Sequence, residues 1–418
     1  MKNEWKQVAL GNVAEINPAR TLKKGMITPF IPMNALSAHT RSPARIDKRT
    51  FIGQGVKFQN GDTLLARITP CLENGKTVFV SGLPEMCVAH GSTEYIVMSG
   101  KTGIADSLFI YYLSRSNDFR NHAITHMEGT SGRQRVPNDV VEKYSLPLPP
   151  LPEQKTIARI LGTLDDKIEL NRRMNATLEA MACALFQSWF VDFAPVHAKA
   201  AGRQPSGMDA PTAPLFPASF QDSELGEMPE GWEIKSLDQV AQYLNGLALQ
   251  KYPPNDGTTL PVIKIAQLRK GDSVDADRCD SNIPPEYVID DGDVLFSWSG
   301  SLEVEIWCGG RGALNQHLFK VTSHDFPQWF YYHWTRQHLD NFRLIAASKA
   351  TTMGHIQRKH LTEAKVLVPP MSLIKTLTPS IQPLLDKIVA NRIQSRTLAT
   401  LRNTLLPQFL SGTLQINH

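Results

Sequence analysis

The stretch "SLPLPPLPEQKTIARIL" (145–161) places four prolines directly before an uninterrupted helical pattern. Proline fixes its own backbone torsion and has no amide donor, so the first three prolines favour a stiff, extended segment. Pro152 suits the first turn of a helix, and Glu153 complements the positive helix N-terminus. We therefore predict a defined elbow that joins a globular domain to a long helix.

A second elbow, "KVLVPPMSLIKTLTPSI" (365–381), follows 220 residues after the first. Other landmarks recur in the same order, which is the signature of an internal repeat. The chain is therefore two copies of one unit. The matched pairs are "WKQVALGNVAEINP" (5–18) with "WEIKSLDQVAQYLNG" (232–246), "NGDTLLARITP" (60–70) with "DGDVLFSWSGS" (291–301), and "TSGRQRVPNDVVEKYSLPLPP" (130–150) with "ATTMGHIQRKHLTEAKVLVPP" (350–370).

The first part of each copy mixes strand and helix patterns. Short β-branched and aromatic runs, such as "GKTVFVSG" (75–82) and "TEYIVMSG" (93–100), lie between turn residues and predict strands. A helical pattern follows at 107–124, and its counterpart in the second copy is 327–345. Each copy therefore begins with a globular α+β domain.

The second part of each copy is a heptad pattern. Apolar residues recur at alternating steps of four and three from Ile157 to Trp189, and in the same register from Leu377 to Phe409. A seam of this length needs a partner helix, and the other copy supplies one. We predict that the two helices form an intramolecular antiparallel coiled coil with a pseudo-two-fold axis.

Asn171 and Asn391 interrupt the seam at equivalent positions near the middle of each helix. In an antiparallel pair with a pseudo-two-fold axis, the midpoints face their own equivalents. We therefore expect Asn171 to meet Asn391 and to select the register. The alternative is a polar residue tolerated at a solvated stretch. Helices of about 57 Å, at 1.5 Å per residue, would separate the domains by more than one turn of DNA.

The net charge of +4 does not identify a nucleic-acid binder, but the charges are unevenly distributed. Residues 20–76 hold ten basic and three acidic side chains, and residues 311–365 hold eight and three. The stretch 272–293 holds eight acids and one arginine. Two separate basic regions suit a polyanion bound at two places, although ordinary solvated surfaces fit the charges equally well.

The five cysteines show no C-x-x-C spacing, which argues against disulfides and a zinc site. We expect a cytoplasmic protein with no membrane association, since no apolar run is long enough to span a bilayer and no signal peptide begins the chain.

The sequence lacks the common catalytic motifs for phosphate loops, zinc proteases and serine nucleophiles. "FIGQG" (51–55) has the glycine spacing of adenosylmethionine loops, but no strand precedes it and no [DN]-P-P-[YF] motif accompanies it. Asp165 and Asp166 lie on the predicted helix and are interpreted as part of a solvated face. We predict no catalytic residue and no metal site.

Several segments resemble the specificity subunit of Type I restriction-modification systems, and the match spans essentially the whole chain. They are "GDTLLARITP", the elbow and helix "SLPLPPLPEQKTIARILGTLDDKIELNRRMNATLEAMACALFQSWF", "SELGEMPEGW", "GDVLFSWSGSLEVEIWCGGRGALNQHLFKV" and "VLVPP". The family's architecture alternates two target-recognition domains with two conserved helices. It implies a first recognition domain at 1–150, a long helix at 151–193, a linker at 194–224, a second recognition domain at 225–370 and a second long helix at 371–412.

The resemblance implies a non-catalytic subunit that reads a bipartite sequence of double-stranded DNA and sets its spacer. Two methyltransferase subunits would bring adenosylmethionine and methylate a flipped adenine in each half-site. Motor-endonuclease subunits would bring ATP and magnesium. The second elbow lacks the Glu-Gln pair of the first, so any partner contact through that pair would differ between the copies. The alternatives are a self-contained DNA modification enzyme and a scaffold that binds DNA without sequence preference.

Candidate DNA contacts follow from side-chain chemistry, since Arg, Gln, Asn and hydroxyl groups suit base edges and Lys suits phosphates. Turn-forming residues with local hydrogen bonds are the alternative for each. The candidates in the first copy are Arg67, Thr69, Arg133, Gln134 and Arg135. Those in the second are Ser297, Ser299, Asn315, Gln316, His317, Thr351, Thr352 and His355, with Lys349 and Lys359 for phosphates.

The stretch 194–220 is rich in Ala, Pro and Gly. We interpret it as a partly extended, poorly ordered linker that lets the chain return to the second domain.

Overall fold

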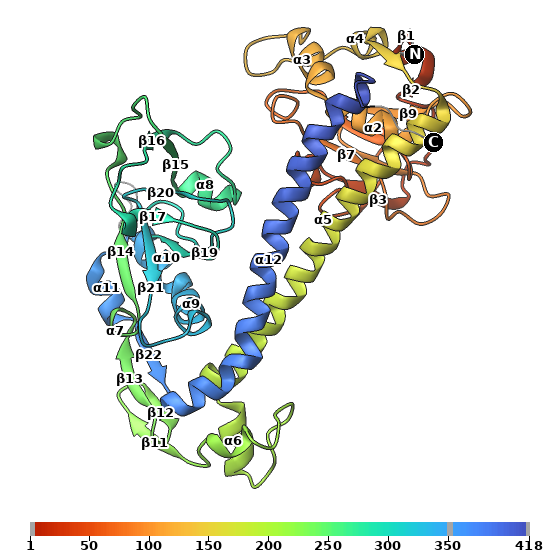
Figure 1. The fold of residues 1–418 in the computed structure, drawn as a ribbon. Coiled ribbons are helices and arrows are strands. Elements are labelled where there is room, and N and C mark those ends of the chain that lie inside the picture. Colours follow the sequence, from red (N-terminus) through yellow and green to blue (C-terminus); the bar gives the residue numbers. More distant parts are fainter. Residues whose placement is uncertain (1–4, 349–353, 415–418) are drawn as a thin grey trace. The chain divides into compact units, whose positions relative to one another are not determined.

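The computed structural model describes residues 5–348 and 354–414. The chain divides into two compact units, Met1–Leu170 with Thr397–His418, and Asn171–Arg396. Two long helices, α5 (Leu151–Phe186) and α12 (Met371–Leu410), each contribute residues to both units (Figure 1).

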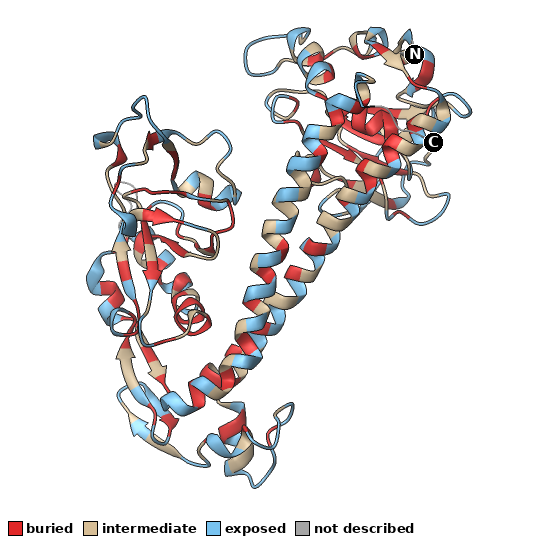
Figure 2. Ribbon diagram, in the orientation of Figure 1, coloured by how far each residue is buried: buried red, intermediate tan, exposed pale blue. Residues whose placement is uncertain are grey.

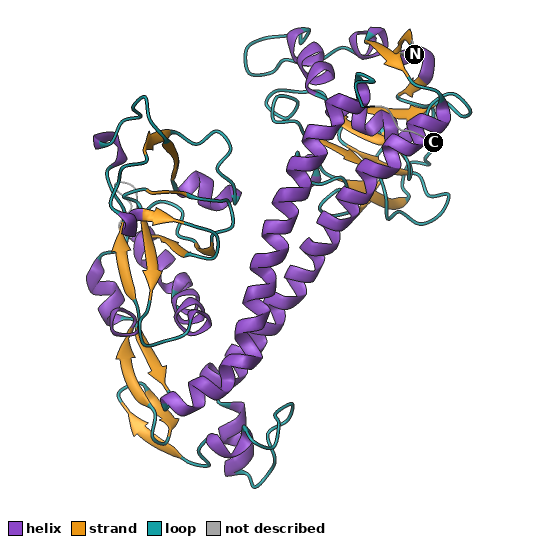
Figure 3. Cartoon of the chain, viewed as in Figure 1, coloured by secondary structure: helices purple, strands orange, loops and turns teal. Residues whose placement is uncertain are grey.

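The first unit contains two four-stranded sheets and a two-stranded ribbon (Figure 3). The sheet orders are β4-β3-β8-β5 and β2-β9-β6-β7, and β1 pairs with β10. Its elements are β1 (Lys6–Ala9), α1 (Leu10–Val13), β2 (Ala14–Ile16), β3 (Ile27–Ile31), β4 (Asp47–Thr50), β5 (Lys57–Phe58), β6 (Thr63–Ala66), β7 (Thr77–Phe79), β8 (Ala89–Gly91), β9 (Tyr95–Gly100), α2 (Ser107–Arg115), α3 (Asn117–Thr125), α4 (Asn138–Lys143) and β10 (Ser145–Leu148).

The second unit repeats this topology. Its sheet orders are β16-β15-β20-β17 and β14-β21-β18-β19, and β13 pairs with β22. The elements are α6 (Ala194–Ala200), β11 (Phe220–Ser223), β12 (Gly226–Pro229), β13 (Glu233–Ser236), α7 (Leu237–Val240), β14 (Gln242–Asn245), β15 (Thr259–Ile263), α8 (Ile265–Lys270), β16 (Arg278–Asp280), β17 (Val288–Ile289), β18 (Val294–Ser297), β19 (Val304–Ile306), β20 (Gly312–Leu314), β21 (Leu318–Thr322), α9 (Gln328–Gln337), α10 (Leu339–Ser348), α11 (Arg358–Glu363) and β22 (Lys365–Val368).

The repeat extends to unusual details of strand pairing. Both units contain one parallel pair in an otherwise antiparallel sheet, β3 with β8 and β15 with β20. The aspartate of the Gly-Asp landmark also makes an equivalent hydrogen bond in both units. Asp62 accepts the amide of Gln59 at 2.8 Å, and Asp293 accepts that of Asp290 at 2.8 Å. Each carboxylate thereby fixes the turn that leads into its central strand, and the α+β repeat predicted from the sequence is confirmed.

The helix predicted at 107–124 is divided in two. Ser116 ends α2, and its hydroxyl caps α3 by accepting the amide of Phe119 at 3.2 Å. The counterpart predicted at 327–345 is likewise two helices, α9 and α10. Apolar periodicity continues across both breaks, which is why the sequence pattern did not reveal them.

The first elbow is locked by a buried side chain. β10 pairs with β1, and α5 begins at Leu151. Gln154 is fully buried; its amide donates to the carbonyls of Pro149 at 2.8 Å and Ile104 at 3.2 Å, and its oxygen accepts the amide of Asp106 at 3.0 Å. This glutamine therefore braces its own domain and offers nothing to a partner. Its counterpart in the second elbow, Ile374, is buried among apolar side chains.

The predicted antiparallel pairing of the long helices is present within each unit, and buried residues recur along both helices (Figure 2). The polar centre differs in detail from the expectation. The amide of Asn391 donates to Oδ1 of Asn175 at 2.8 Å, and the amide of Asn171 donates to Oγ of Ser395 at 3.2 Å. Asn171 meets Asn391 only through the backbone carbonyl of Asn391, at 3.3 Å.

These two bonds are equivalent, since Asn171 corresponds to Asn391 and Asn175 to Ser395 in the repeat. The pseudo-two-fold axis therefore passes between the two pairs, so each asparagine faces the residue four positions from its own counterpart. The expected pairing of midpoints was wrong by about one helical turn.

The interpretation of Asp165 as a solvated residue was wrong. Its side chain is 3% exposed and forms an ion pair with Arg402, whereas Asp166 is exposed and bonds to Arg41. Leu164, which the heptad pattern placed on the seam, is only half-buried. A helix of 3.6 residues per turn drifts from a strict heptad, and here the drift brings Asp165 inward.

The segment interpreted as an extended linker contains regular structure. It holds α6 and the strand β11, which pairs with β12. Phe216 is 1% exposed, with its ring centroid 6.5 Å from that of Trp189. The aromatic side chains anchor a segment whose Ala, Pro and Gly content had suggested a flexible coil.

Candidate nucleic-acid interface

Two loops of the first unit lie antiparallel beside the end of β6. The amide of Val136 donates to the carbonyl of Arg67 at 2.9 Å, and the amide of Thr69 donates to the carbonyl of Gln134 at 3.0 Å. The backbone therefore brings the two groups of candidates in this copy together. We call residues 67–69 and 133–136 the first loop pair.

Arg133 stands at the tip of this loop pair. Its amide donates to the carbonyl of Thr130 at 3.0 Å, which closes a tight turn. Gly132 within that turn has φ +78°, a value that side chains with a Cβ rarely adopt. The Arg133 side chain is exposed, so its donors are accessible to a ligand.

Arg135 is held by an acidic partner. Its Nε and Nη2 donate to the Glu94 carboxylate at 2.9 Å and 2.7 Å, and Nη1 donates to the carbonyl of Arg133 at 3.2 Å. The hydrogen bonds and charge of Arg135 lower the pKa of Glu94. These contacts fix the loop and compete with any contact from Arg135 to a base edge.

Arg67 and Thr69 leave polar atoms without partners among the described residues. Nη1 of Arg67 makes a long bond of 3.4 Å to Asn138, and its buried Nε has no acceptor. The buried hydroxyl of Thr69 also has no partner. Buried polar groups are usually satisfied, but such unpartnered atoms also occur elsewhere in this unit, for example at Thr63 and Thr77, so they do not single out the loop pair.

The second unit builds the same scaffold at equivalent positions. The amide of Ile356 donates to the carbonyl of Trp298 at 3.0 Å, and the amide of Gly300 donates to the carbonyl of Gly354 at 2.9 Å. We call residues 298–300 and 354–356 the second loop pair. In the repeat, Trp298 stands where the first copy has Arg67, and His355 stands where it has Arg135.

Trp298 organises the second loop pair and was missed in the sequence analysis. Its Nε1 donates to Oδ1 of Asn245 at 2.8 Å, and its ring centroid lies 5.8 Å from that of His317 and 6.3 Å from that of His355. The signal was present in the repeat, because Trp298 aligns with the candidate Arg67.

Three candidates of the second copy are buried. Ser297 donates to the carbonyl of Ser301 at 2.6 Å, Ser299 bonds to Nδ1 of His317 at 3.0 Å, and Asn315 accepts the amide of His317 at 3.3 Å. Each is less than 5% exposed. Ser299 and Asn315 shape the loop around His317, whereas Ser297 holds the turn at Ser301. None of the three side chains faces solvent.

The remaining candidates divide into accessible residues and residues outside the described part of the chain. Gln316, His317 and His355 are half-buried, and Lys359 is exposed on α11. The candidates Lys349, Thr351 and Thr352 lie outside the described residues.

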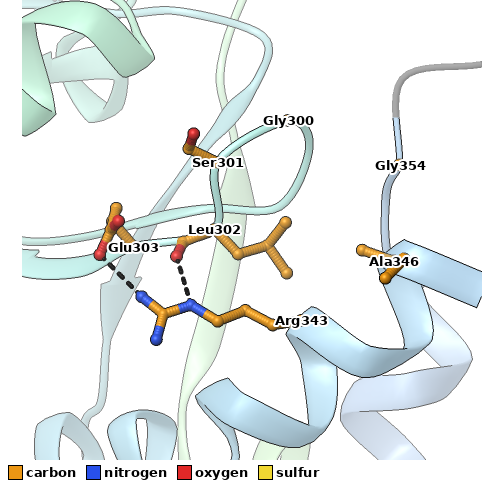
Figure 4. Close-up of a pocket in the computed structure, with 8 residues that line it drawn as sticks. Gly300, Ser301, Leu302, Glu303, Arg343, Ala346 and Gly354 are labelled. Carbon is orange, nitrogen blue, oxygen red and sulfur yellow. Dashed lines mark hydrogen bonds and ion pairs between the residues drawn. The ribbon is translucent and has the colours of Figure 1, made fainter. Parts of the chain in front are cut away.

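A pocket of about 460 Å³ adjoins the second loop pair and is lined by Gly300, Leu302, Glu303, Arg343 and Gly354, among others (Figure 4). Arg343 donates to the Glu303 carboxylate at 3.0 Å and to the carbonyl of Leu302 at 3.2 Å. Its charge is thus neutralised within the pocket.

Several basic side chains of residues 20–76 in the first unit form internal ion pairs. Arg20 pairs with buried Asp62 at 2.8 Å, and Arg41 pairs with Asp166. The exposed members of the run include Lys23, Lys24 and Lys48. The acids of 272–293 are paired in part as well, including Asp291 with Arg396 and Asp293 with Lys320, both bonds within the second unit. Fewer free charges remain than the sequence count suggests.

Within the described ranges 5–348 and 354–414, no helix is both long and apolar enough to cross a bilayer. The same part of the chain brings together no cluster of three or more His, Cys, Asp or Glu side chains suited to a metal ion.

The chain is similar to curated proteins along most of its length. It is 25% identical over 410 residues to the Type I restriction enzyme HindI specificity subunit of Haemophilus influenzae, covering 87% of this chain and 88% of that protein. It is 24% identical over 325 residues to the Type I restriction enzyme MjaIX specificity subunit of Methanocaldococcus jannaschii, covering 76% and 71%.

Among solved structures, the Type I restriction-modification system S subunit from M. genitalium has the same fold, with a TM-score of 0.57 at 13% identity over 99% of this chain and 97% of that one. The model of the Type I restriction modification DNA specificity domain matches residues 2–180 and 229–393. The two matches correspond to the two copies of the repeat. The chain therefore belongs to the Type I restriction modification DNA specificity family, as a specificity subunit rather than a catalytic one.

Proposed function

We propose that this chain reads a bipartite sequence in double-stranded DNA, one half-site with each loop pair. The observation that carries the proposal is that one backbone scaffold is built twice with different side chains. The bond from Thr69 to Gln134 matches that from Gly300 to Gly354, while Arg67 is replaced by Trp298 and Arg135 by His355. A constant scaffold with variable side chains suits recognition of two different sequences.

The accessible candidates fit roles in direct readout. In the first loop pair, Arg133 is exposed, and its guanidinium suits the O6 and N7 acceptors of guanine. Gln134 suits adenine. The unpartnered Nε of Arg67 and hydroxyl of Thr69 are buried and not open to a base edge. In the second copy, Gln316, His317 and His355 are the corresponding candidates, and Lys359 suits a phosphate.

The buried candidates take a supporting role in this proposal. Ser299 and Asn315 hold the loop that presents Gln316 and His317, and Ser297 holds the turn that follows β18. Arg135 with Glu94 holds the loop that presents Arg133. Replacing them would alter recognition through loop position rather than through loss of a base contact.

The long helices would set the spacer between the half-sites, since α5 is continuous over 36 residues and α12 over 40 residues. Methylation and cleavage would belong to partners: two methyltransferase subunits with adenosylmethionine, and motor-endonuclease subunits with ATP and magnesium. The chain's own residues would supply specificity and docking surfaces, in the cytoplasm where such partners act.

The experiment is to map modified adenines in cells that express the chain with its methyltransferase partner. The proposal expects a motif of two defined stretches separated by a fixed run of undefined bases. The purified chain without partners should transfer no methyl groups to DNA. Methyl transfer by the chain alone would support a self-contained enzyme, and binding without sequence preference would support a scaffold.

A further inference from the structure

A buried charge cluster joins the long helices at one end of their pairing. Arg402 of α12 forms an ion pair with Asp165 of α5, and the two side chains are 5% and 3% exposed. Tyr112 of α2 donates to the other carboxylate oxygen of Asp165 at 2.7 Å. All three residues belong to the first unit, and the pair satisfies two charges that would be costly to bury alone.

The positions equivalent to Asp165 and Arg402 in the second unit hold apolar residues. An offset of 220 residues places Leu385 at the position of Asp165 and Ala182 at the position of Arg402. Both are buried in the apolar core of the second unit. Helices α2 and α9 are offset by 221 residues, as their N-caps Asp106 and Pro327 show, so the counterpart of Tyr112 is His333. His333 is also buried and stacks on Phe186 with ring centroids 5.1 Å apart. At these matched positions the first unit is therefore ionic and the second apolar. The ion pair that joins the helices in the second unit, Glu179 with Arg392 at 2.7 Å, is only partly buried.

Two pairs at the asparagine centre, Asn171 with Ser395 and Asn175 with Asn391, are equivalent in the repeat and do not distinguish the copies. Asn171 also donates to Oε1 of Gln394 at 2.9 Å, and the counterpart of Gln394 is Met174. If α5 paired with α5 of a second chain in the same register, Asn171 would face Asn175. If α12 paired with α12, Asn391 would face Ser395. Polar side chains would meet in every case, so these two pairs set the register without selecting the partner helix.

We propose that the Asp165–Arg402 pair makes α5 pair with α12 and prevents either helix from pairing with its own kind. In an α5–α5 pair, each Asp165 would be buried against Ala182 of the other chain without a cation. In an α12–α12 pair, each Arg402 would be buried against Leu385 without an acid. A buried charge without its partner is strongly destabilising. Each α5–α5 or α12–α12 pair would contain two such unpaired charges, so both are disfavoured relative to α5–α12.

The consequence concerns which domains are joined. The two globular domains carry different side chains on the same scaffold, so pairing of like helices would join two identical domains. The ion pair therefore keeps one copy of each domain in every assembly. This selectivity is a property of chain pairing and is tested without DNA.

The test uses the full chain with a protease site inserted in the exposed segment 201–204, so that the purified protein is nicked into an N-half and a C-half. The nicked protein is unfolded in urea, refolded and analysed by native mass spectrometry. Three pairings differ in mass: N–C, N–N and C–C. For the unmodified sequence, N–C should exceed the other two by more than about 100-fold.

The variants make opposite predictions. Asp165→Leu removes the acid that blocks α5–α5 pairing, so the N–N product should appear. Arg402 is left without its acidic partner and still blocks α12–α12 pairing, so the C–C product should stay absent. Arg402→Ala should give C–C and no N–N. The double variant Asp165→Leu/Arg402→Ala gives both ends the same chemistry, and the ratio of N–C to the like pairs should fall to about one, the random value.

The reversed pair Asp165→Arg/Arg402→Asp is the matched control, since it keeps two complementary charges and should restore N–C pairing. Like pairs from the unmodified sequence would overturn the proposal. So would exclusive N–C pairing in the double variant, or the same product from both single variants. If the double variant does not refold, the two single variants and the reversed pair decide the question in the same assay.

Discussion

The side-chain amide of Asn391 lies 2.8 Å from Oδ1 of Asn175, and both side chains are buried between α5 and α12. We expect Asn391→Leu to destabilise the second unit by about 1–3 kcal/mol, because Oδ1 of Asn175 is left buried without a donor. The change is measured as a lower midpoint of urea unfolding.

Asn175→Leu/Asn391→Leu provides the control for this pair. Removing both polar groups leaves no orphaned partner between these two side chains, so the double variant should be more stable than Asn391→Leu alone. An unfolding midpoint for Asn391→Leu equal to that of the unmodified chain would show that the bond does not contribute.

The first elbow should depend on Gln154. Replacement by Ile, the residue at the equivalent position of the second copy, leaves the Asp106 amide and the Pro149 carbonyl without their buried partner. We expect Gln154→Ile to lower the free energy of unfolding of the first unit by about 1–3 kcal/mol.

The matched exchange in the second elbow is Ile374→Gln, which buries an amide among apolar side chains and should destabilise as well. Urea unfolding of both variants measures the effect. If both exchanges were neutral, the elbows would be interchangeable and Gln154 would have no bracing role.

His333 should make stability depend on pH. Burial, with a smaller contribution from Arg336, lowers the pKa of His333 to about 3, whereas an unfolded histidine titrates near pH 6.5. Between these values the unfolded chain binds a proton that the folded chain does not. The free energy of unfolding therefore falls as pH falls through this window, by about 1.4 kcal/mol per pH unit.

His333→Phe should remove this contribution while keeping the ring that stacks on Phe186. The loss of stability between pH 7 and pH 5 should be about 2 kcal/mol smaller for the variant than for the unmodified chain. Equal losses in both proteins would mean that His333 takes up a proton in the folded state.

The repeat could be predicted from the sequence because its landmark residues determine the local backbone conformation. Proline elbows and Gly-Asp turns fix torsions and amide bonds locally, and Asp62 and Asp293 make equivalent bonds for that reason. Side-chain polarity at the helix seam was less informative. A buried Asp165 looks the same in sequence as the exposed Asp166. Its partners Tyr112 and Arg402 lie 53 and 237 residues away, and no local pattern reveals them.

The sequence pattern also did not predict where helices break or where they continue through a proline. Pro379 and Pro383 lie inside α12, where each removes one backbone hydrogen bond, and the helix continues through them. Its apolar face is buried in the second unit, and this packing outweighs local propensity. At the candidate interface, residue chemistry selected Arg133 and Gln316 but also buried residues such as Ser297, because burial is set by contacts distant in sequence.

The most direct test of the account is to map modified adenines in cells that express the methyltransferase partner with the unmodified chain, with Arg133→Ala or with Gln316→Ala. Arg133 belongs to the first loop pair and Gln316 adjoins the second, so the account predicts a bipartite motif in which each variant relaxes a different half and leaves the other half and the spacer unchanged. A single continuous motif, or relaxation of the same half by both variants, would contradict it.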